Sequence, residues 1–267
     1  VVNAVKRGMD VSYWQGLINW ERVKADDIDF AILRCGYVKT LGRPQVDQQW
    51  KRNAQECERL GIPYGVYIYS YAKTVEAAKA EADHVINTLK GFSPTYPVYF
   101  DLEEKSLEST SNRMLLANMA SAFCDKIAAA GYTPGIYANT NWWNNYLTDP
   151  VFDQWERWVA QYNSKCSYTR GSYRLWQCSA SGKVDGIVGN VDLDLEFDGA
   201  FASNPVRKTW VKVGSNWYLR DSGGNNLIGW QVVDGQRYYL AASGVMQTGW
   251  VSYEGSWYYL SGSGAMK

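Results

Sequence analysis

The feature that most constrains the fold is an alternation of strand-like and helix-like segments over the first 140 residues. Short apolar runs, such as FAILRCGY (30–37) and YGVYIYSY (64–71), alternate with longer stretches of helical periodicity, such as residues 46–61 and 74–91. Strands that alternate with helices of this length pair in parallel and are joined by right-handed crossovers. The alternation therefore predicts a parallel sheet covered by helices.

The same pattern sets the expected order of the other elements. Further strands are expected at residues 7–15, 96–103 and 133–140, and further helices at 18–25 and 111–131. Gly61 is expected as a left-handed helix C-cap, and Ser111 or Asn112 as a helix N-cap.

Beyond residue 155 the alternation stops. The segments RWVAQY, YRLWQCSA and VDLDLEF are strand-like and are joined by polar, Gly-rich loops. Earlier in the chain, LGIPYGVYIYS and AGYTPGIYANT repeat one junction of helix, Gly, Pro and aromatic strand, which indicates repeated βα units. We therefore predict an irregular α/β barrel, in which five βα units are closed by three further strands.

The segment YPVYFDLEE (96–104) joins an apolar strand to a group of acids at its carboxyl end. Alternate side chains of a strand share a face, so Asp101 and Glu103 are expected on one face, about 7 Å apart. Two like charges beside an apolar run raise the pKa of one carboxyl, and a raised pKa suits a general acid. The alternative is a strand whose tip emerges into solvent.

Two more acids stand at strand ends. Asp10 ends the first strand, and Asp192 opens the segment VDLDLEF. Reactive side chains in α/β barrels lie at the carboxyl ends of strands, which makes both acids candidates. Asp10 has a second interpretation as a cap of the following turn, and Asp194 and Glu196 are interpreted as an exposed acidic edge.

The chain has a single histidine, His84, in a helical stretch. A Ser-His-Asp triad or a Cys-His peptidase would have to use it, and a multi-His zinc site is excluded. Carboxylates must therefore carry any hydrolytic chemistry. No metal or organic cofactor is implied, although clusters of acids can bind calcium.

The five cysteines show no CxxC spacing, which disfavours a zinc site. Cys35 and Cys124 fall in apolar patterns and are expected in the core. Cys166 and Cys178 flank a short polar segment and could form a disulfide, but the odd total leaves at least one thiol unpaired.

Composition narrows the class of partner. The formal net charge is zero and no basic stripe is present, which disfavours nucleic acid and anionic membranes. No apolar run reaches the 18 residues of a membrane span, and no signal peptide is visible. The 13 Trp and 20 Tyr are suited to sugar faces, interfaces and stacked hairpins.

Three tryptophans mark a repeat near the end of the chain and lie 20 residues apart: Trp210, Trp230 and Trp250. Each opens a unit of short aromatic strands and Gly-containing turns, which predicts β-hairpins. The fixed period predicts a small all-β solenoid, because no single hairpin can bury its own face. The polar segment 197–209 separates the two parts, so domains are predicted at 1–203 and 204–267.

The first two hundred residues resemble the family 25 glycoside hydrolases. Six blocks carry the resemblance, which covers roughly residues 6–200: RGMDVSYWQG, YPVYFDLEE, GIYANTNWW, WVAQYN, LWQCSASGKVDGI and GNVDLDLEF. Members of this family are N-acetylmuramidases (lysozymes) that cut peptidoglycan, and they occur among phage endolysins and bacterial autolysins. The resemblance implies a flattened (β/α) barrel with five helices and eight strands.

The resemblance also implies roles for the four acids. Glu103 matches the general acid, which protonates the glycosidic oxygen between N-acetylmuramic acid and N-acetylglucosamine. Asp101 matches the partner of the reacting sugar, which either orients its 2-acetamido group or stabilises an oxocarbenium-like transition state. Asp10 and Asp192 match the other acids of the groove. The sequence leaves retention, inversion and a substrate-assisted route open.

Aromatic side chains on the same face of the barrel are expected to contact the sugars. For each of them, packing in the core is the alternative interpretation. The candidates are Tyr37, Tyr67, Tyr69, Tyr137, Trp142 and Trp176.

The tail resembles cell-wall-binding repeats of the choline-binding type. In these repeats three rings from consecutive hairpins enclose a quaternary ammonium group through cation–π attraction. Trp210 and Trp217, with Tyr238 or Tyr239, would form such a cage. Arg237 stands where the flanking units have tryptophan, and a cation there opposes a bound cation.

A second and poorer cage would combine Trp230 with Tyr258 or Tyr259. Choline, wall teichoic acid, a wall polysaccharide and a purely structural stack remain open interpretations of the repeats. The residues expected to bind the wall polymer are Trp210, Trp217, Trp230, Tyr239, Trp250, Trp257 and Tyr259.

Together these features predict a peptidoglycan hydrolase that cleaves the β-1,4 bond between N-acetylmuramic acid and N-acetylglucosamine and is held on the wall by its repeats. The alternatives are a non-catalytic glycan-binding protein and a hydrolase of another N-acetylhexosamine polymer, such as chitin. The predicted location is outside the cell at the bacterial wall, or release as a phage endolysin. The sequence does not separate a phage lysin from an autolysin.

Overall fold

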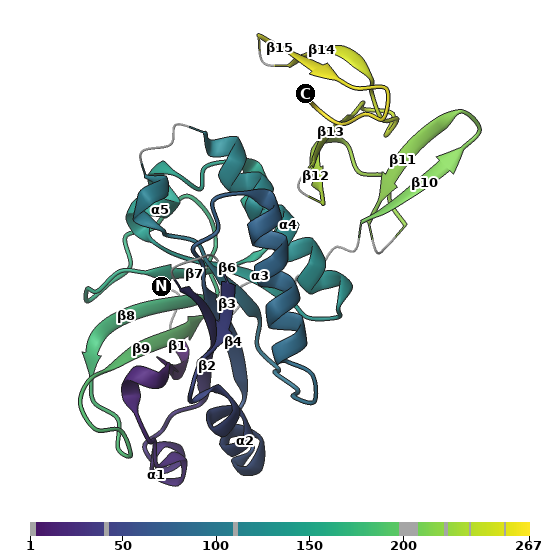
Figure 1. Ribbon diagram of the computed structural model, residues 1–267. Helices are drawn as coiled ribbons and strands as arrows, with labels where there is room; N and C mark the ends of the chain where they lie inside the picture. The colour runs from purple at the N-terminus through teal and green to yellow at the C-terminus, as the bar shows by residue number, and fades with distance from the viewer. Residues whose placement is uncertain are drawn as a thin grey trace.

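The computed structural model describes residues 4–39, 43–108, 112–197, 208–221, 224–234, 236–253 and 255–267 (Figure 1). The first part of the chain forms a closed barrel covered by helices, and the last part forms a stack of hairpins that lies beside helix α4. This arrangement confirms the predicted fold class. The predicted domain boundary at 203/204 lies outside the described residues.

Eight strands close the barrel: β1 (Ala4–Val11), β2 (Phe30–Lys39), β4 (Tyr64–Tyr69), β5 (Val98–Asp101), β6 (Pro134–Asn139), β7 (Glu156–Ala160), β8 (Leu175–Gly182) and β9 (Val191–Phe197). Around the barrel they follow the order β1-β9-β8-β7-β6-β5-β4-β2, and β2 pairs with β1 to complete the ring. Strand β9 is antiparallel to both of its neighbours, whereas the other barrel pairs are parallel. The short strand β3 (Arg43–Val46) is added on the outside of β2.

Five α-helices occur in the part of the chain that the structure describes: α1 (Trp20–Ala25), α2 (Trp50–Leu60), α3 (Val75–Thr88), α4 (Arg113–Ala129) and α5 (Thr140–Asn145). Three 3-10 turns, η1 (Tyr13–Gln15), η2 (Lys105–Leu107) and η3 (Pro150–Gln154), complete the connections. Gly61 ends α2 in the left-handed conformation, with φ of 66°, and Asn112 caps α4, as predicted.

Two elements, α5 and β3, were not among the expected segments. The sequence of α5, TNWWNN, is too short to show a helical period, and the helix begins because the Asn139 side chain caps it. Strand β3 contains Pro44, which is tolerated because β3 lies at an edge.

The core has two layers. Apolar residues on the outer face of the strands pack against the helices, whereas the barrel interior holds a smaller, mainly aromatic cluster. In that cluster Phe30 stacks on Tyr96 with ring centroids 4.8 Å apart, and Trp158 contacts Tyr99 and Tyr137 at 5.1 and 4.5 Å. Large rings thus fill much of the barrel interior, and polar side chains lie at the end of the barrel where the parallel strands finish.

The interpretation of Asp194 and Glu196 as an exposed acidic edge is wrong. Strand β9 lies between β1 and β8, so its inward side chains are buried, and Asp194 is 0 % exposed. Glu196 pairs with Arg174 at 2.7 Å and Lys6 at 3.2 Å, and it accepts a hydrogen bond from the Tyr96 hydroxyl. The apolar and acidic residues of β9 therefore alternate because one face of the strand lines a polar barrel interior, not because that face meets solvent.

The tail consists of three hairpins, each a two-stranded sheet: β10 (Thr209–Val213) with β11 (Asn216–Arg220), β12 (Gly229–Val233) with β13 (Gln236–Leu240), and β14 (Gly249–Tyr253) with β15 (Ser256–Leu260). A glycine with φ near 82° occupies the same place in each unit, at Gly224, Gly244 and Gly264. Successive units are joined by equivalent hydrogen bonds, from Met246 N to Trp217 O and from Met266 N to Arg237 O, both 2.8 Å. The predicted period is confirmed.

The sequence analysis considered the cysteines and His84 for chemical roles, and the structure shows where they lie. All five cysteines are free thiols, so the possible Cys166–Cys178 disulfide is not formed, and Cys35 and Cys124 are buried as expected. His84 is half-buried on α3, which packs against β2 and β3. Among the described residues, no helix combines the length and apolar character needed to cross a membrane.

Candidate functional site

Four acids meet at the end of the barrel where the parallel strands finish. Asp10 lies near the end of β1 and directly opposite Asp192 of the antiparallel β9. Asp101 is the last residue of β5, and Glu103 follows two residues later. Tyr67 of β4 lies among these acids: burial raises its pKa first, and the charges of Asp10, Asp101 and Asp192 raise it further. The fold therefore gathers the predicted carboxylates at one end of the barrel, here called its mouth.

Glu103 is held by a neighbour that the sequence analysis did not single out. Because β5 ends at Asp101, Glu103 lies beyond the strand rather than on its face, and Asn139 at the end of β6 fixes it. The Asn139 backbone N–H and side-chain amide both donate to Glu103 Oε2, at 3.1 and 2.7 Å. The Asn139 Oδ1 accepts from the Trp142 backbone N–H at 3.1 Å, so the α5 cap orients the amide toward Glu103.

Burial raises the pKa of Glu103, and the two hydrogen bonds from Asn139 oppose the rise. The nearby Glu108 raises this pKa further, whereas Lys105 lowers it. A half-buried carboxyl with a raised pKa keeps its proton at higher pH than a free glutamic acid. Such a group can donate a proton to a leaving oxygen.

Asp101 is 4 % exposed, and its Oδ1 has no hydrogen-bond partner among the described residues. Burial raises its pKa first and the charge of Glu103 second, whereas Arg34 lowers it. A buried polar atom without a partner is costly in a folded protein. Asp101 Oδ1 is thus an unsatisfied acceptor among the described residues at this end of the barrel.

Arg34 is a second residue that the sequence analysis missed. Its guanidinium pairs with the buried Asp47 at 2.7 Å and lies 4.9 Å from the ring centroids of both Tyr13 and Tyr37. Asp47 also accepts from the Tyr13 backbone N–H, which ties η1 to this cluster. An arginine that follows an apolar strand segment gives no sequence signal of a role in a functional site. Its position beside Asp101 follows from the parallel pairing of β2, β4 and β5.

Asp10 belongs to a buried hydrogen-bond network. Gln177 Nε2 donates to Asp10 Oδ2 at 2.6 Å, and Gln177 Oε1 accepts from the hydroxyls of Tyr137 and Tyr162 at 2.9 and 3.1 Å. These two hydroxyls fix the orientation of the Gln177 amide, with its N–H toward Asp10. Asp10 is therefore placed by side chains from β8 and does not serve merely as a turn cap.

Asp194 lies near Asp10 in the same buried interior. Its Oδ1 accepts from Trp158 Nε1 at 2.7 Å, whereas its Oδ2 has no hydrogen-bond partner among the described residues. Burial raises the pKa of Asp10 and the charges of Asp194 and Asp192 raise it further; burial and the charge of Asp192 raise the pKa of Asp194 to about 8, and burial raises the pKa of Asp192 to about 6. The mouth thus holds protons that solvent-exposed aspartates would release.

The predicted sugar-binding aromatics divide into two sets. Tyr37, Tyr67, Tyr69 and Tyr137 lie with the acids or with Arg34 at the mouth. Trp142 and Trp176 are buried, at 1 % and 6 % exposed, and their indole N–H groups bond to Glu108 and to the Gln161 backbone oxygen. The structure does not bring these two tryptophans to the carboxylates.

Tyr162 is a further aromatic residue at the mouth. It is 59 % exposed, donates to Gln177, and its pKa is raised by burial and by the charges of Asp192, Asp10 and Glu103. Tyr162 belongs to the block WVAQYN, which carried part of the family resemblance. Nothing in the sequence selects this tyrosine, because it stands alone between two polar residues. A partly exposed ring beside carboxylates can stack on a sugar.

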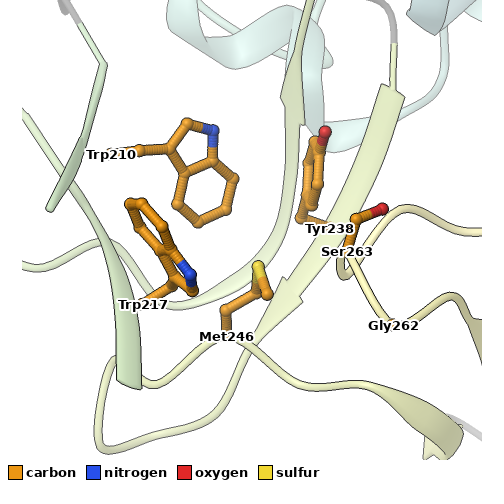
Figure 2. Close-up of a pocket in the computed structure, with 6 residues that line it drawn as sticks. All are labelled: Trp210, Trp217, Tyr238, Met246, Gly262 and Ser263. Atoms are coloured by element: carbon orange, nitrogen blue, oxygen red, sulfur yellow. The ribbon is translucent and has the colours of Figure 1, made fainter. Parts of the chain in front are cut away.

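The tail contains an aromatic pocket of about 290 Å³, which Figure 2 shows. Its walls are Trp210, Trp217, Tyr238 and Met246, and Gly262 and Ser263 of the third unit approach its rim. The rings of Trp210 and Tyr238 meet at 4.8 Å with an angle of 69°. The prediction left Tyr238 or Tyr239 open and then selected Tyr239, but the structure brings Tyr238 to this pocket.

The remaining predicted wall-binding residues lie elsewhere on the stack. Tyr239 packs against Trp230 at 5.1 Å and Tyr253 at 5.8 Å. Three rings of the third unit are exposed, at 68 %, 67 % and 44 %: Trp250, Trp257 and Tyr259. Met246 was missed because methionine has no ring and the sequence did not show which turn folds back onto Trp217.

Comparisons with known protein families match both parts of the chain. Residues 9–187 match the family described as glycosyl hydrolases family 25. In the tail, residues 208–225 match a putative cell wall binding repeat and residues 227–267 match a choline-binding repeat.

Individual relatives share the barrel. The chain is 30 % identical over 190 residues to "Uncharacterized protein YegX" of Escherichia coli O157:H7, a match that covers 70 % of this chain and 68 % of the relative. It is 26 % identical over 200 residues to the "Autolytic lysozyme" of Clostridium acetobutylicum, covering 75 % of this chain and 58 % of that one.

Among solved structures, the modular autolysin LytC from Streptococcus pneumoniae, solved in complex with a synthetic peptidoglycan ligand, superposes with a TM-score of 0.64 and 29 % identity. That match covers 71 % of this chain but only 46 % of LytC, so less than half of the larger protein is represented. The family match includes Asp10, Asp101 and Glu103 and ends just before Asp192, while the tail matches cover the aromatic pocket. The chain belongs to the family 25 glycosyl hydrolases and carries a tail of cell-wall-binding repeats of the choline-binding type.

Proposed function

We propose that this chain hydrolyses the β-1,4 bond between N-acetylmuramic acid and N-acetylglucosamine in peptidoglycan. The observation that carries the proposal is Glu103, a half-buried carboxyl with a raised pKa that Asn139 holds beside Asp101. Family membership supplies the reaction class, and the synthetic peptidoglycan ligand of the LytC complex supports the substrate class. The barrel is proposed to span residues 1–203 and the tail residues 204–267.

In the proposed reaction Glu103 gives its proton to the glycosidic oxygen as the bond from that oxygen to the anomeric carbon breaks. The free Oδ1 of Asp101 accepts the acetamido N–H of the sugar or faces the developing positive charge at the anomeric carbon. Water then adds to the anomeric carbon and returns a proton to the enzyme. Asp10 and Asp192 line the groove, and Tyr67, Tyr69 and Tyr162 contact the sugar faces.

Mass spectrometry of the fragments released from purified Gram-positive walls, after borohydride reduction, tests the proposal. Reduced N-acetylmuramic acid ends are expected with the wild type, and the Glu103→Gln variant should lose about 10²-fold or more of the rate. Reduced N-acetylglucosamine ends would instead identify a glucosaminidase. No release from any wall, despite binding, would leave the barrel as a glycan-binding domain.

We further propose that the pocket formed by Trp210, Trp217 and Tyr238 binds a quaternary ammonium group of a wall polymer through cation–π attraction. Its three rings and the Met246 side chain provide an apolar enclosure open on one side. Choline on wall teichoic acid has this chemistry. Calorimetric titration with free choline tests the assignment, and Trp217→Ala should abolish the heat of binding at this pocket. The protein would then act at the bacterial wall, outside the cell.

A further inference from the structure

The second tail unit repeats the geometry of the first except at two positions. Trp230 and Tyr258 meet at 4.9 Å and 70°, nearly the same arrangement as Trp210 and Tyr238. The place of Trp217 is taken by Arg237, which lies directly opposite Val232 in the hairpin.

The position opposite the tryptophan is polar in the other two units. The cross-strand pairs there are Lys212–Trp217 and Ser252–Trp257, and both Lys212 and Ser252 are exposed. In the second unit Val232 is 2 % exposed and joins the hydrophobic core of the barrel domain. At this cross-strand position the first and third units pair a polar residue with tryptophan, whereas the second unit pairs valine with arginine.

Both altered residues face the barrel domain. The Arg237 guanidinium forms an ion pair with Asp149, whose carboxylate also caps η3 by accepting from the Val151 backbone N–H at 2.9 Å. The side chains of Arg237 and Asp149 are only 12 % and 17 % exposed. Val232 packs beside α4, and its backbone oxygen accepts from Ser121 Oγ at 3.2 Å.

Two further contacts extend the same surface. The Asp234 backbone N–H donates to Asp125 Oδ2 of α4 at 3.3 Å. Lys208 Nζ donates to the Val232 backbone oxygen at 3.0 Å, and Asp125 is a nearby charge that offsets the burial of Lys208. Helix α4 thus receives the second hairpin along one side, as Figure 1 shows.

We infer that the second unit is a docking element rather than a ligand cage: Arg237 and Val232 bind it to α4 and η3 of the barrel domain. The Arg237 charge also repels a quaternary ammonium group from the ring pair of Trp230 and Tyr258. The tail is thereby held in one orientation relative to the catalytic mouth. The docking does not depend on the proposed function, whereas the statement about the ligand class rests on it.

The double variant Val232→Lys/Arg237→Trp, which gives the second unit the residues of the first, tests the docking. Calorimetric unfolding should change from one coupled transition to two, and small-angle X-ray scattering should show a larger radius of gyration. Ser252→Lys introduces the same lysine at the equivalent exposed position of the third unit and is the matched control. It should leave both measurements unchanged.

A scattering profile and an unfolding curve identical to those of Ser252→Lys would overturn the docking. The ligand statement has its own readout, because Arg237→Trp should add one choline site per chain to the wild-type number in a calorimetric titration. If the wild type binds no choline at all, the ligand class fails while the docking result still stands. If the wild type binds choline but Arg237→Trp adds no site, the role of Arg237 in excluding the cation is wrong.

Discussion

At the scale of single residues, the mouth of the barrel is organised around where protons are held. Burial raises the pKa of Glu103 and Asn139 holds its carboxyl in position, while burial also raises the pKa of Asp10 and of Asp194. These two arrangements differ in purpose: Glu103 is proposed to release a proton during the reaction, whereas the raised pKa values of Asp10 and Asp194 let two acids stay side by side in a buried place.

The Asn139→Ser variant isolates the side-chain hydrogen bond to Glu103. The amide stabilises the anionic form, so its loss should raise the pKa of Glu103 further. The reaction needs the protonated acid, and activity is lost as the pH rises through this pKa. The alkaline limb of kcat/KM should therefore move upward by about one unit, with a lower maximum rate.

Serine at this position still caps α5, so the melting temperature serves as the control and should change by only a few degrees. An alkaline limb that stays in place, or moves to lower pH, would contradict the role given to the Asn139 amide.

The Asp194→Asn variant tests the raised pKa of Asp194 through stability. A carboxyl whose pKa is raised by folding binds more protons in the folded than in the unfolded state, so stability is highest below its unfolded pKa and falls as the pH rises through the folded pKa. An amide at Asp194 cannot titrate but can still accept from Trp158. The decline in unfolding free energy from about pH 4 to about pH 8 should therefore shrink by on the order of 1 kcal/mol.

Urea unfolding at a series of pH values measures that decline. Asp185→Asn, at an exposed aspartate near α1, is the control and should leave the pH dependence unaltered. An unchanged slope in Asp194→Asn would mean that folding does not raise the pKa of Asp194.

At the scale of secondary-structure elements, the strands determine which side chains meet. The positions of Asp10, Asp101 and Asp192 could be predicted because each closes or opens a strand with a clear apolar pattern. Asn139 and Arg34 could not be predicted, because their contacts depend on which strands are neighbours and on α5, whose six residues carry no period. Asp194 was misread because the same alternation describes an exposed edge and a strand facing a polar barrel interior.

Gly8 of β1 shows how closely the strands and the ring cluster fit. A Cβ atom added at Gly8 would lie 2.3–2.5 Å from the buried Phe30 ring, which itself stacks on Tyr96. Gly8→Ala should destabilise the protein by about 1–3 kcal/mol, because this ring has no space to move into. The double variant Gly8→Ala/Phe30→Leu removes the clash, and denaturant unfolding should show a smaller loss than the two single variants would sum to. Additive losses would refute this account of Gly8.

At the scale of the whole molecule, two binding events are proposed to act on one wall. The mouth of the barrel is proposed to engage a glycan strand, and the aromatic pocket of the tail is proposed to engage a decoration of the same wall. The contacts of Val232 and Arg237 with α4 and η3 hold the two sites in a fixed relation. Once the tail is bound, the glycan encounters the mouth at a raised effective concentration. The sequence predicts both sites but not their relative placement, because nothing in a repeat pattern specifies which unit contacts the barrel.

Because the two proposed sites lie in different domains, we expect that one substitution can weaken wall attachment without weakening bond cleavage. Trp217→Ala removes a wall of the pocket, far from the carboxylates, and should reduce lysis of choline-containing walls by about 10-fold or more. Its kcat/KM on short soluble glycan fragments should stay within about twofold of the wild type, because such fragments have no wall decoration to bind. Ser252→Ala, at an exposed position of the third unit outside the predicted wall-binding set, is the control and should leave both measurements unchanged. Equal losses of activity on walls and on soluble fragments would show instead that the pocket supports catalysis by stabilising the fold. The tail would then be a structural extension of the barrel rather than its attachment to the wall.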